Sequence, residues 1–241
     1  MSGHSKWKNI LHKKEKTDSQ RAKTYSKISK EIIVAVKEGG GTDPASNSRL
    51  KDCIAKAKAA NVPGENIRRV IEKAAGADSA NYETIIYEGY GPSGVAVIVE
   101  TMTDNRNRTA SEMRHYFDKY GGNLGATGCV SWMFDRKGVI VIESEGLDED
   151  TIMMDALDAG AADLSDEGEF YEIYTAPEEC GKVTEALEEK GYAFVSAEVE
   201  MVPQSYIRLD AEEESRKMQT LLDMLEDNDD VQNVWHNWEQ A

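Results

Sequence analysis

The chain has 241 residues and a formal net charge of −17, with 40% hydrophobic and 30% charged residues. This length can bury a substantial core, and the composition is typical of a globular protein. Three widely spaced cysteines, Cys53, Cys129 and Cys180, argue for reduced thiols in the cytoplasm and against a disulfide framework or zinc site. No run approaches the roughly 18 apolar residues of a membrane helix, and no secretory signal follows the basic N-terminus. We therefore expect a cytoplasmic protein starting at Met1, with no membrane partner, metal or cofactor.

Charge is distributed very unevenly along the chain. Residues 1–75 hold 17 Lys and Arg against 8 Asp and Glu, a net charge of +9. The remaining 166 residues hold 11 basic and 37 acidic groups, a net charge of −26. A basic end on an acidic protein indicates a polyanionic partner, such as a nucleic acid, that is contacted at that end only.

Residues 1–78 predict a basic helical domain with a flexible N-terminal arm. The arm, 1–17, is polar and basic. Asp18 or Ser19 can cap a helix that runs to about Glu38, and Asp43-Pro44 predicts the cap and first turn of a second helix. A third helix follows Pro63-Gly64.

The first helix is expected to have two contrasting faces. At about 100° per residue, Tyr25, Ile28, Ile32 and Val36 fall on one side. The opposite side carries four lysines, Lys23, Lys27, Lys30 and Lys37. One face can therefore pack on a core while the other meets phosphates.

From Tyr82 onward the apolar period changes from that of helices to that of strands. We predict strands at 82–88 and 95–101, a helix at 109–120, a hairpin of 130–134 and 139–142 around 135–138, and a helix at 148–159. Then follow a strand at 170–174, a helix from Pro177 that ends before Gly191, and a strand at 192–201. Asp210 and Glu213 resemble a capping box that starts a helix through Leu225, and 231–238 is the last strand.

The predicted fold class is α+β, with an N-terminal three-helix domain followed by two α/β domains with antiparallel sheets. Neither 82–129 nor the tail from 205 makes a complete sheet alone, so we expect them to combine. The expected domains are 1–78, then 79–130 plus 205–241, with a ferredoxin-like domain of 131–204 inserted between those two pieces.

Four motifs carry a resemblance to a known family. They are Gly3-His4-Ser5-Lys6-Trp7, Tyr87-Glu88-Gly89-Tyr90-Gly91-Pro92, Thr103-Asp104-Asn105-Arg106-Asn107-Arg108-Thr109 and Val130-Ser131-Trp132-Met133-Phe134. Along essentially the whole chain, the sequence resembles the YebC family. The resemblance implies the same three-domain fold and a probable transcriptional regulatory protein that binds DNA. A mitochondrial branch acts as a translational activator of cytochrome oxidase, and some bacterial members look like ribosome-associated factors that ease elongation through proline-rich stretches.

The predicted nucleic-acid-binding residues lie in the arm, in the first helix and in the loop before residue 109. Lysine and arginine gain affinity for phosphates by displacing counterions, and Trp7 could stack on a base or fold back on the domain. Arg106 and Arg108 stand at a helix start, where free amides add to the donors, although capping by Asn107 or Thr109 is the simpler interpretation. The full set is Lys6, Trp7, Lys8, Lys13, Lys14, Lys16, Arg21, Lys23, Lys27, Lys30, Arg106 and Arg108.

Catalysis is not expected, because no nucleophile stands beside a base. The carboxylates are so numerous that they do not indicate a catalytic pair. The glycines at 121, 122, 125 and 128 lack a phosphate-loop pattern and are more simply turns. We predict a nucleic-acid-binding regulator of gene expression, a probable transcriptional regulatory DNA-binding protein. The alternatives are a ribosome-associated translation factor that binds RNA and a protein-interaction adaptor whose acidic third domain docks on a basic partner.

Overall fold

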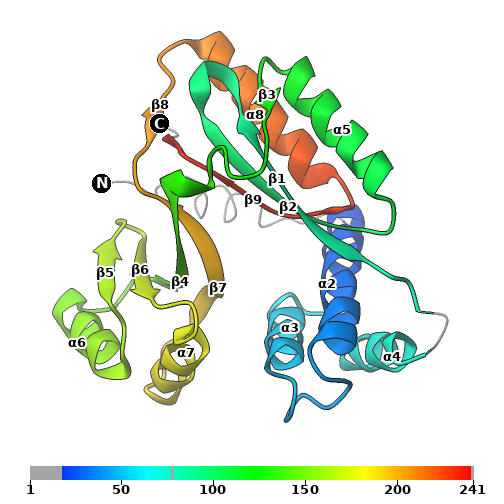
Figure 1. Ribbon diagram of the computed structural model, residues 1–241. Helices are drawn as coiled ribbons and strands as arrows, with labels where there is room; N and C mark the ends of the chain where they lie inside the picture. The colour runs from blue at the N-terminus through cyan, green and yellow to red at the C-terminus, as the bar shows by residue number, and fades with distance from the viewer. Residues whose placement is uncertain (1–17, 77–78, 240–241) are drawn as a thin grey trace. The chain divides into compact units, whose positions relative to one another are not determined.

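The computed structural model describes residues 18–76 and 79–239 (Figure 1). Its described residues divide into two compact units. The inserted unit comprises 131–208 and 237–239, and the larger unit comprises the helical segment up to 76, residues 79–130 and residues 209–236. The α+β class is confirmed, with N-terminal helices followed by antiparallel sheets.

Three helices begin the larger unit: α2 (Asp18–Glu38), α3 (Ser48–Ala59) and α4 (Gly64–Ala74). They bury one apolar cluster, in which Ile28 and Ile32 of α2 meet Leu50 of α3 and Ile67 of α4. All three helices were predicted. Their packing follows from apolar residues at helical spacing, which each helix must bury against another element.

The start of α3 corrects the sequence prediction. Asn47, not Asp43, caps this helix, since its side chain accepts a hydrogen bond of 3.0 Å from the amide of Leu50. The same buried amide group donates to the carbonyls of Ala35 and Gly41, each at 2.8 Å. Asn47 therefore caps α3 and ties it to the end of α2, while Asp43 forms only a local turn.

The sheet of the larger unit is built from distant parts of the sequence. Strands β1 (Glu83–Tyr90), β2 (Ala96–Thr103), β3 (Asn123–Leu124) and β9 (Val231–His236) are arranged in the order β3-β1-β2-β9, all antiparallel. Two helices, α5 (Arg106–Lys119) and α8 (Glu212–Asp227), lie side by side against the sheet (Figure 1). The C-terminal segment thus completes the sheet begun at residue 83.

Helix α8 begins without the predicted capping box. The helix starts at Glu212, and Ala211 at its N-cap supplies no side-chain hydrogen bond. The start of the helix is stabilised instead by three acidic residues in its first turn, Glu212, Glu213 and Glu214. Their negative charges lie near the positive end of the helix dipole.

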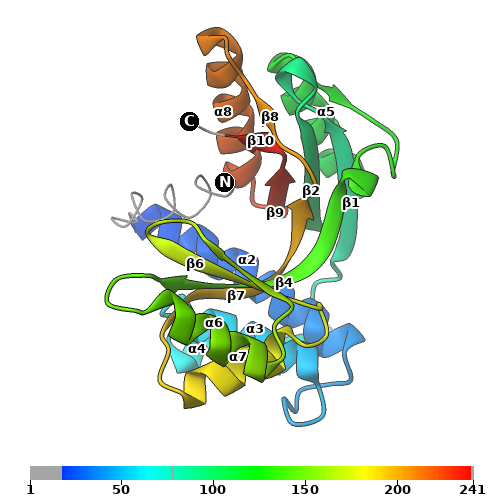
Figure 2. The same ribbon diagram turned by 90° about the vertical axis from the view of Figure 1, so that its left-hand side faces the viewer.

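The inserted unit has its own antiparallel sheet and core. Its strands are β4 (Phe134–Glu143), β5 (Asp163–Asp166), β6 (Phe170–Thr175) and β7 (Phe194–Pro203), in the order β5-β6-β4-β7. Helices α6 (Glu149–Ala159) and α7 (Cys180–Glu189) cover one face, as Figure 2 shows. A short parallel pair, β8 (Ile207–Arg208) and β10 (Trp238–Glu239), also belongs to this unit.

The predicted hairpin at 130–142 is wrong. Residues 134–143 form the single strand β4, which pairs with β7 from Phe134 to Ile142. Gly138 lies in mid-strand, where an added Cβ would lie 2.1 Å from the Thr175 hydroxyl and 2.7 Å from the Cys180 Cβ. This glycine therefore allows close packing and does not make a turn.

Glu88 fixes the segment through which the chain leaves the larger unit and enters the inserted unit. Its buried carboxylate accepts hydrogen bonds from the amides of Gly128, at 2.7 Å, and Val130, at 3.0 Å. Gly122 packs tightly too, because a Cβ there would lie 2.4 Å from the Tyr90 carbonyl oxygen. These contacts give the loop before the inserted unit a fixed path and give its glycines a structural role.

Candidate nucleic-acid interface

Helix α2 is buried on two sides, which corrects the expectation that its lysine face is open. Ile28 and Ile32 enter the helical core, as predicted. On the other side, Lys30 is only 8% exposed, and Val34, one turn later, is 2% exposed. Lys30 donates to the Met102 carbonyl oxygen at 3.3 Å, so this side of α2 contacts the end of β2 in the same unit.

Three lysines of this arc bind residues 226–230, here called the acidic loop, which comprise the last turn of α8 and the connection to β9. Lys23 forms an ion pair with Asp227, and the Lys27 ammonium donates to the carbonyl oxygen of Glu226 at 2.8 Å. Lys30 donates to the carbonyl oxygen of Asp229 and to the Asp230 carboxylate, both at 2.8 Å. In this arrangement the protein's own loop occupies the positions where phosphate oxygens were expected.

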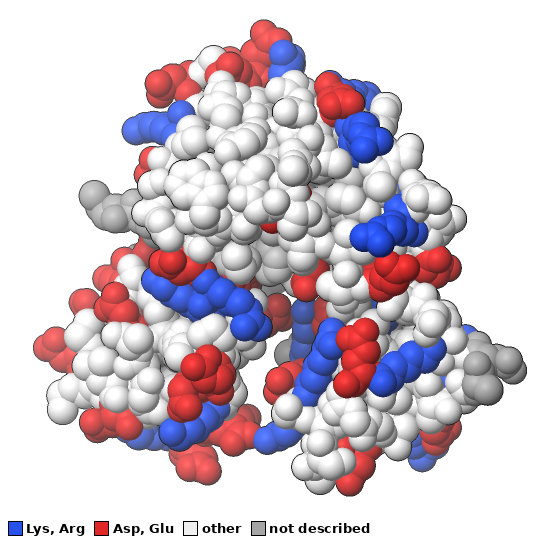
Figure 3. All heavy atoms as spheres, viewed as in Figure 1, with Lys and Arg blue, Asp and Glu red and all other residues white. Residues whose placement is uncertain are grey.

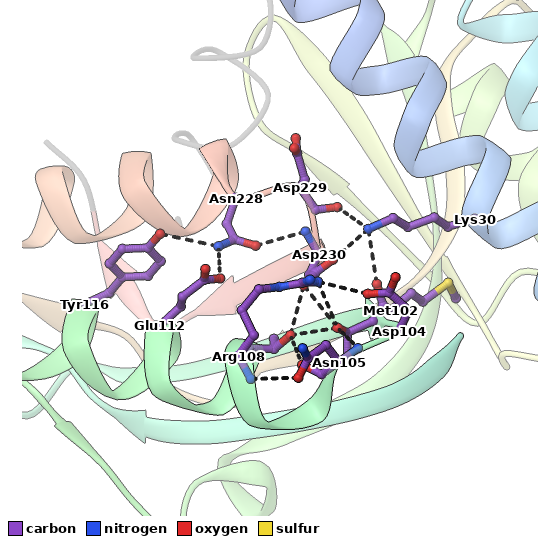
Figure 4. A network of polar contacts seen from close by, with 12 residues as sticks. Lys30, Met102, Asp104, Asn105, Arg108, Glu112, Tyr116, Asn228, Asp229 and Asp230 are labelled. Atoms are coloured by element: carbon purple, nitrogen blue, oxygen red, sulfur yellow. Dashed lines mark hydrogen bonds and ion pairs between the residues drawn. The ribbon is translucent and has the colours of Figure 1, made fainter. Parts of the chain in front are cut away.

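Asp230 is the centre of a buried polar network (Figure 4). One of its oxygens accepts from Lys30, and the other accepts from Arg108 at 2.7 Å, Thr109 at 2.9 Å and Thr103 at 3.1 Å. Burial acts to raise the pKa of this carboxyl, but hydrogen bonds from Arg108, Lys30 and Thr109 outweigh it and lower the pKa to about 2. Asp230 therefore stays ionised near neutral pH and joins α2, β2 and α5 to the start of β9.

The pKa of the half-buried Lys27 is shifted by its surroundings. Burial lowers the pKa of its ammonium, and the nearby Glu226 and Asp229 act in the opposite direction. Burial thus disfavours the charged form of Lys27, and the negative charges of Glu226 and Asp229 favour it. Such a balance is suited to a contact within the protein.

The two arginines of the predicted loop site have separate roles. Helix α5 begins at Arg106, and its cap is Asn105, whose side chain accepts from the Arg108 amide at 3.1 Å. The Arg108 guanidinium binds Asp230 and also Asp104, the latter at 3.0 Å. The Arg106 side chain is 68% exposed, with Glu83 3.9 Å away. Both side chains reach solvent, but the Arg108 side chain, 45% exposed, is the one bound to the buried Asp230 carboxylate.

The remaining predicted residues are mostly in the arm. Arg21 is exposed on the first turns of α2. Lys6, Trp7, Lys8, Lys13, Lys14 and Lys16 lie outside the described residues. Their contact with nucleic acid stays a prediction.

A set of exposed cations on α3 and α4 was not included among the predicted site residues. It comprises Arg49, Lys51, Lys58, Arg68, Arg69 and Lys73. Acidic side chains stand among them: Arg49 pairs with Glu38 at 2.9 Å, and Arg68 pairs with Glu65 at 3.2 Å. Figure 3 shows blue and red side chains interleaved over the helical segment on this face. The excess of basic residues in 1–75 was the signal that could have identified this set.

Metal and membrane sites find no support in the described part of the chain. No group of three or more potential metal-binding side chains occurs among residues 18–76 and 79–239. Within those same ranges, no helix has the length and apolarity needed to cross a membrane.

Comparison with known proteins gives a match along nearly the whole chain. Residues 5–77 match a model of the TACO1/YebC protein N-terminal domain, and residues 82–238 match one of the TACO1/YebC second and third domain. A relative from Acetivibrio thermocellus is 63% identical over 240 residues, covering 99% of each chain, and is named a probable transcriptional regulatory protein. One from Caldicellulosiruptor saccharolyticus bears the same name and is 60% identical over 242 residues, covering 100% of this chain and 99% of the relative.

A solved structure agrees with this match. The crystal structure of a conserved hypothetical protein from Aquifex aeolicus has 47% sequence identity and a TM-score of 0.84, covering 93% of this chain and 92% of its own. The two family models together span both units described above. The chain therefore belongs to the TACO1/YebC family.

Proposed function

We propose that this protein is a nucleic-acid-binding regulator of gene expression, that DNA is its target, and that it acts without catalysis. The observation that carries the proposal is the agreement of two independent features. Full-length relatives are named probable transcriptional regulatory proteins. The first 75 residues hold a net charge of +9 in a chain whose total is −17. A polyanion is the partner that such a basic end favours.

The contacts in the larger unit narrow the proposed interface. Lys23, Lys27, Lys30 and Arg108 already bind the protein's own loop, so their first role is to hold the unit together. The proposed interface consists of the exposed cations of α3 and α4, together with Arg21, Arg106 and the lysines of 1–17. Ion pairs at exposed sites contribute about 0–1 kcal/mol, so Arg68 can exchange Glu65 for phosphate at little cost.

Binding of the full chain to duplex DNA, followed by fluorescence anisotropy, tests the proposal. We expect the logarithm of the affinity to fall linearly with the logarithm of salt concentration between about 50 and 200 mM. Binding that ignores salt, or no binding to DNA or RNA at any salt, would contradict the proposal.

The interface is tested by the triple change Arg68→Gln, Arg69→Gln and Lys73→Gln on α4. We expect weaker binding and a salt slope reduced by about 1 for each phosphate that the variant no longer binds. The matched control removes three cations outside the helical segment, through Lys182→Gln, Arg216→Gln and Lys217→Gln. Equal effects of the two triples would show that only net charge matters and that α4 is not the interface.

The nucleic acid itself is identified by crosslinking in cells and sequencing what is bound. Promoter DNA is the expected result. Ribosomal RNA would instead support the translation-factor alternative, because structured RNA would meet the same basic surface through its phosphates.

A further inference from the structure

The sheet of the inserted unit has one face on which neither of its own helices, α6 and α7, packs. Helices α6 and α7 pack on the face that contains Ile140, Ile142 and Ile173. Strand alternation places Val139, Val141 and Tyr174 on the opposite face. Even so, Val139 is 4% exposed and Val141 is fully buried, and Phe170 joins them in a second cluster. This second face is here called the open face because neither α6 nor α7 packs on it. Its apolar residues are nevertheless shielded from solvent.

Glutamates dominate the polar part of the open face. Glu172 pairs with Val141 in the strand register, Glu198 with Val139, and Glu200 with Lys137, so all three share this side. Glu172 is 6% exposed and Glu200 is 8% exposed. The Glu172 carboxylate accepts a hydrogen bond of 2.5 Å from Tyr174. Carboxylates at this depth are stable only beside donors or cations.

The inserted unit as a whole is acidic. Residues 131–208 hold 20 acidic and 5 basic residues, a net charge of −15. Lys182 and Lys190 pair with Glu179 and Asp155 of the helices, and Lys137, on the open face, lies 3.8 Å from Asp135. The open face therefore favours a cationic segment that also carries apolar side chains for the Val139–Val141 strip.

We propose that residues 1–17 of the same chain dock on the open face, and that nucleic acid competes for this segment. The segment holds five lysines and one glutamate, with Trp7, Ile10 and Leu11 as its large apolar residues. Its composition thus matches both the glutamates and the apolar strip. Seventeen residues can extend to roughly 60 Å, which is ample to cross a small domain.

The docked segment would act as an intramolecular competitor. Lysines bound by the protein's own glutamates release no counterions from a phosphate backbone, so docking lowers nucleic-acid affinity. Docking itself is independent of the proposed function, and only the competition rests on it.

Zero-length crosslinking of lysine to carboxylate in the full-length protein, followed by peptide mass spectrometry, tests docking without any nucleic acid. We expect crosslinks from Lys6, Lys8 or Lys13 to the glutamates at 172, 198 or 200. Their yield should be independent of protein concentration. The ion pairs Lys190–Asp155 and Lys217–Glu213, at 2.5 and 2.6 Å, serve as positive controls for the reaction.

Three results would overturn docking of 1–17. The open-face glutamates could crosslink to lysines of the larger unit, the crosslinks could vanish on dilution and so belong to a second copy, or only the control pairs could react. Each of these assigns the face to another occupant or to none.

The competition is tested by neutralising the open face with Glu172→Gln, Glu198→Gln and Glu200→Gln. We expect the affinity for duplex DNA to rise about fivefold or more. We also expect trypsin to cleave faster after the lysines of 1–17. The matched control neutralises three exposed glutamates elsewhere in the unit, Glu145→Gln, Glu188→Gln and Glu189→Gln. If both triples tighten binding equally, the effect is one of net charge and the competition is refuted. If the protein binds no nucleic acid, the proposed function fails while the crosslinks still decide the docking.

Discussion

At the scale of single residues, Asp230 explains why the predicted lysine surface is not open. A carboxylate that is 5% exposed needs strong partners, and Lys30 and Arg108 provide two cations. Thr103 and Thr109 provide two neutral donors. These five side chains are coupled through one carboxylate, so the effects of removing them should not be additive.

Acid should weaken the larger unit through this carboxyl. The folded-state pKa of Asp230 is about 2, below the usual 3.8, so the unfolded chain binds more protons between these values. Its contribution, about 2 kcal/mol, is therefore present above pH 4 and is lost as pH falls from about 4 to 2. Chemical denaturation of the wild type against Asp230→Asn across this range measures it. A variant that loses stability with the same slope as the wild type would contradict the assignment.

Glu88 is a second buried carboxylate whose partners are backbone amides. Replacement of Glu88 by Gln leaves one of the two amides, Gly128 or Val130, facing an NH₂ group. We expect a loss of about 1–3 kcal/mol of unfolding free energy and faster hydrogen exchange at these two amides. Glu83→Gln, at an exposed position of the same strand, is the control and should change neither quantity.

At the scale of elements, α2 shows how one helix can serve two interfaces. Its apolar arc was readable because Ile28 and Ile32 follow the helical period. Its lysine arc looked like a surface because lysines are normally exposed. The loop that covers these lysines, with Asp227 and Asp230, comes from the far end of the chain, so no local pattern could place it there.

Strand β4 contains Gly138, and its replacement tests whether close packing requires a glycine in mid-strand. Gly138→Ala places a Cβ against Thr175 and Cys180, and we expect a loss of about 1–3 kcal/mol from overpacking. Gly181→Ala, in helix α7 with open space around its added Cβ, should be neutral or slightly stabilising. Thermal or denaturant unfolding compares the two. Equal effects would mean that Gly138 is not kept by close packing.

At the scale of the whole molecule, two units with separate cores are joined by three chain crossings within residues 18–76 and 79–239. The crossings lie at 130/131, 208/209 and 236/237. Because Lys30, Arg108 and Asp230 all belong to the larger unit, their loss should be felt there first. The three-domain division of the sequence prediction remains a prediction, since the contacts of the helical segment group it with the discontinuous sheet.

Native-state hydrogen exchange can test this independence. In Asp230→Asn we expect faster exchange of the β2 and β9 amides, and unchanged exchange of the β4 and β6 amides, since separate cores open separately. Faster exchange in β4 and β6 to the same degree would show that the two units unfold as one.

The sequence by itself determined the α+β class, the three basic helices and the approximate bounds of β1, β2, β6, β7 and β9, because period and turn residues are local properties. It also located the charge asymmetry and the motifs shared with the family. Only the tertiary structure decided which cations face solvent. Exposure depends on what packs against a side chain, and Lys30 is buried against Asp230, 200 residues away in the sequence.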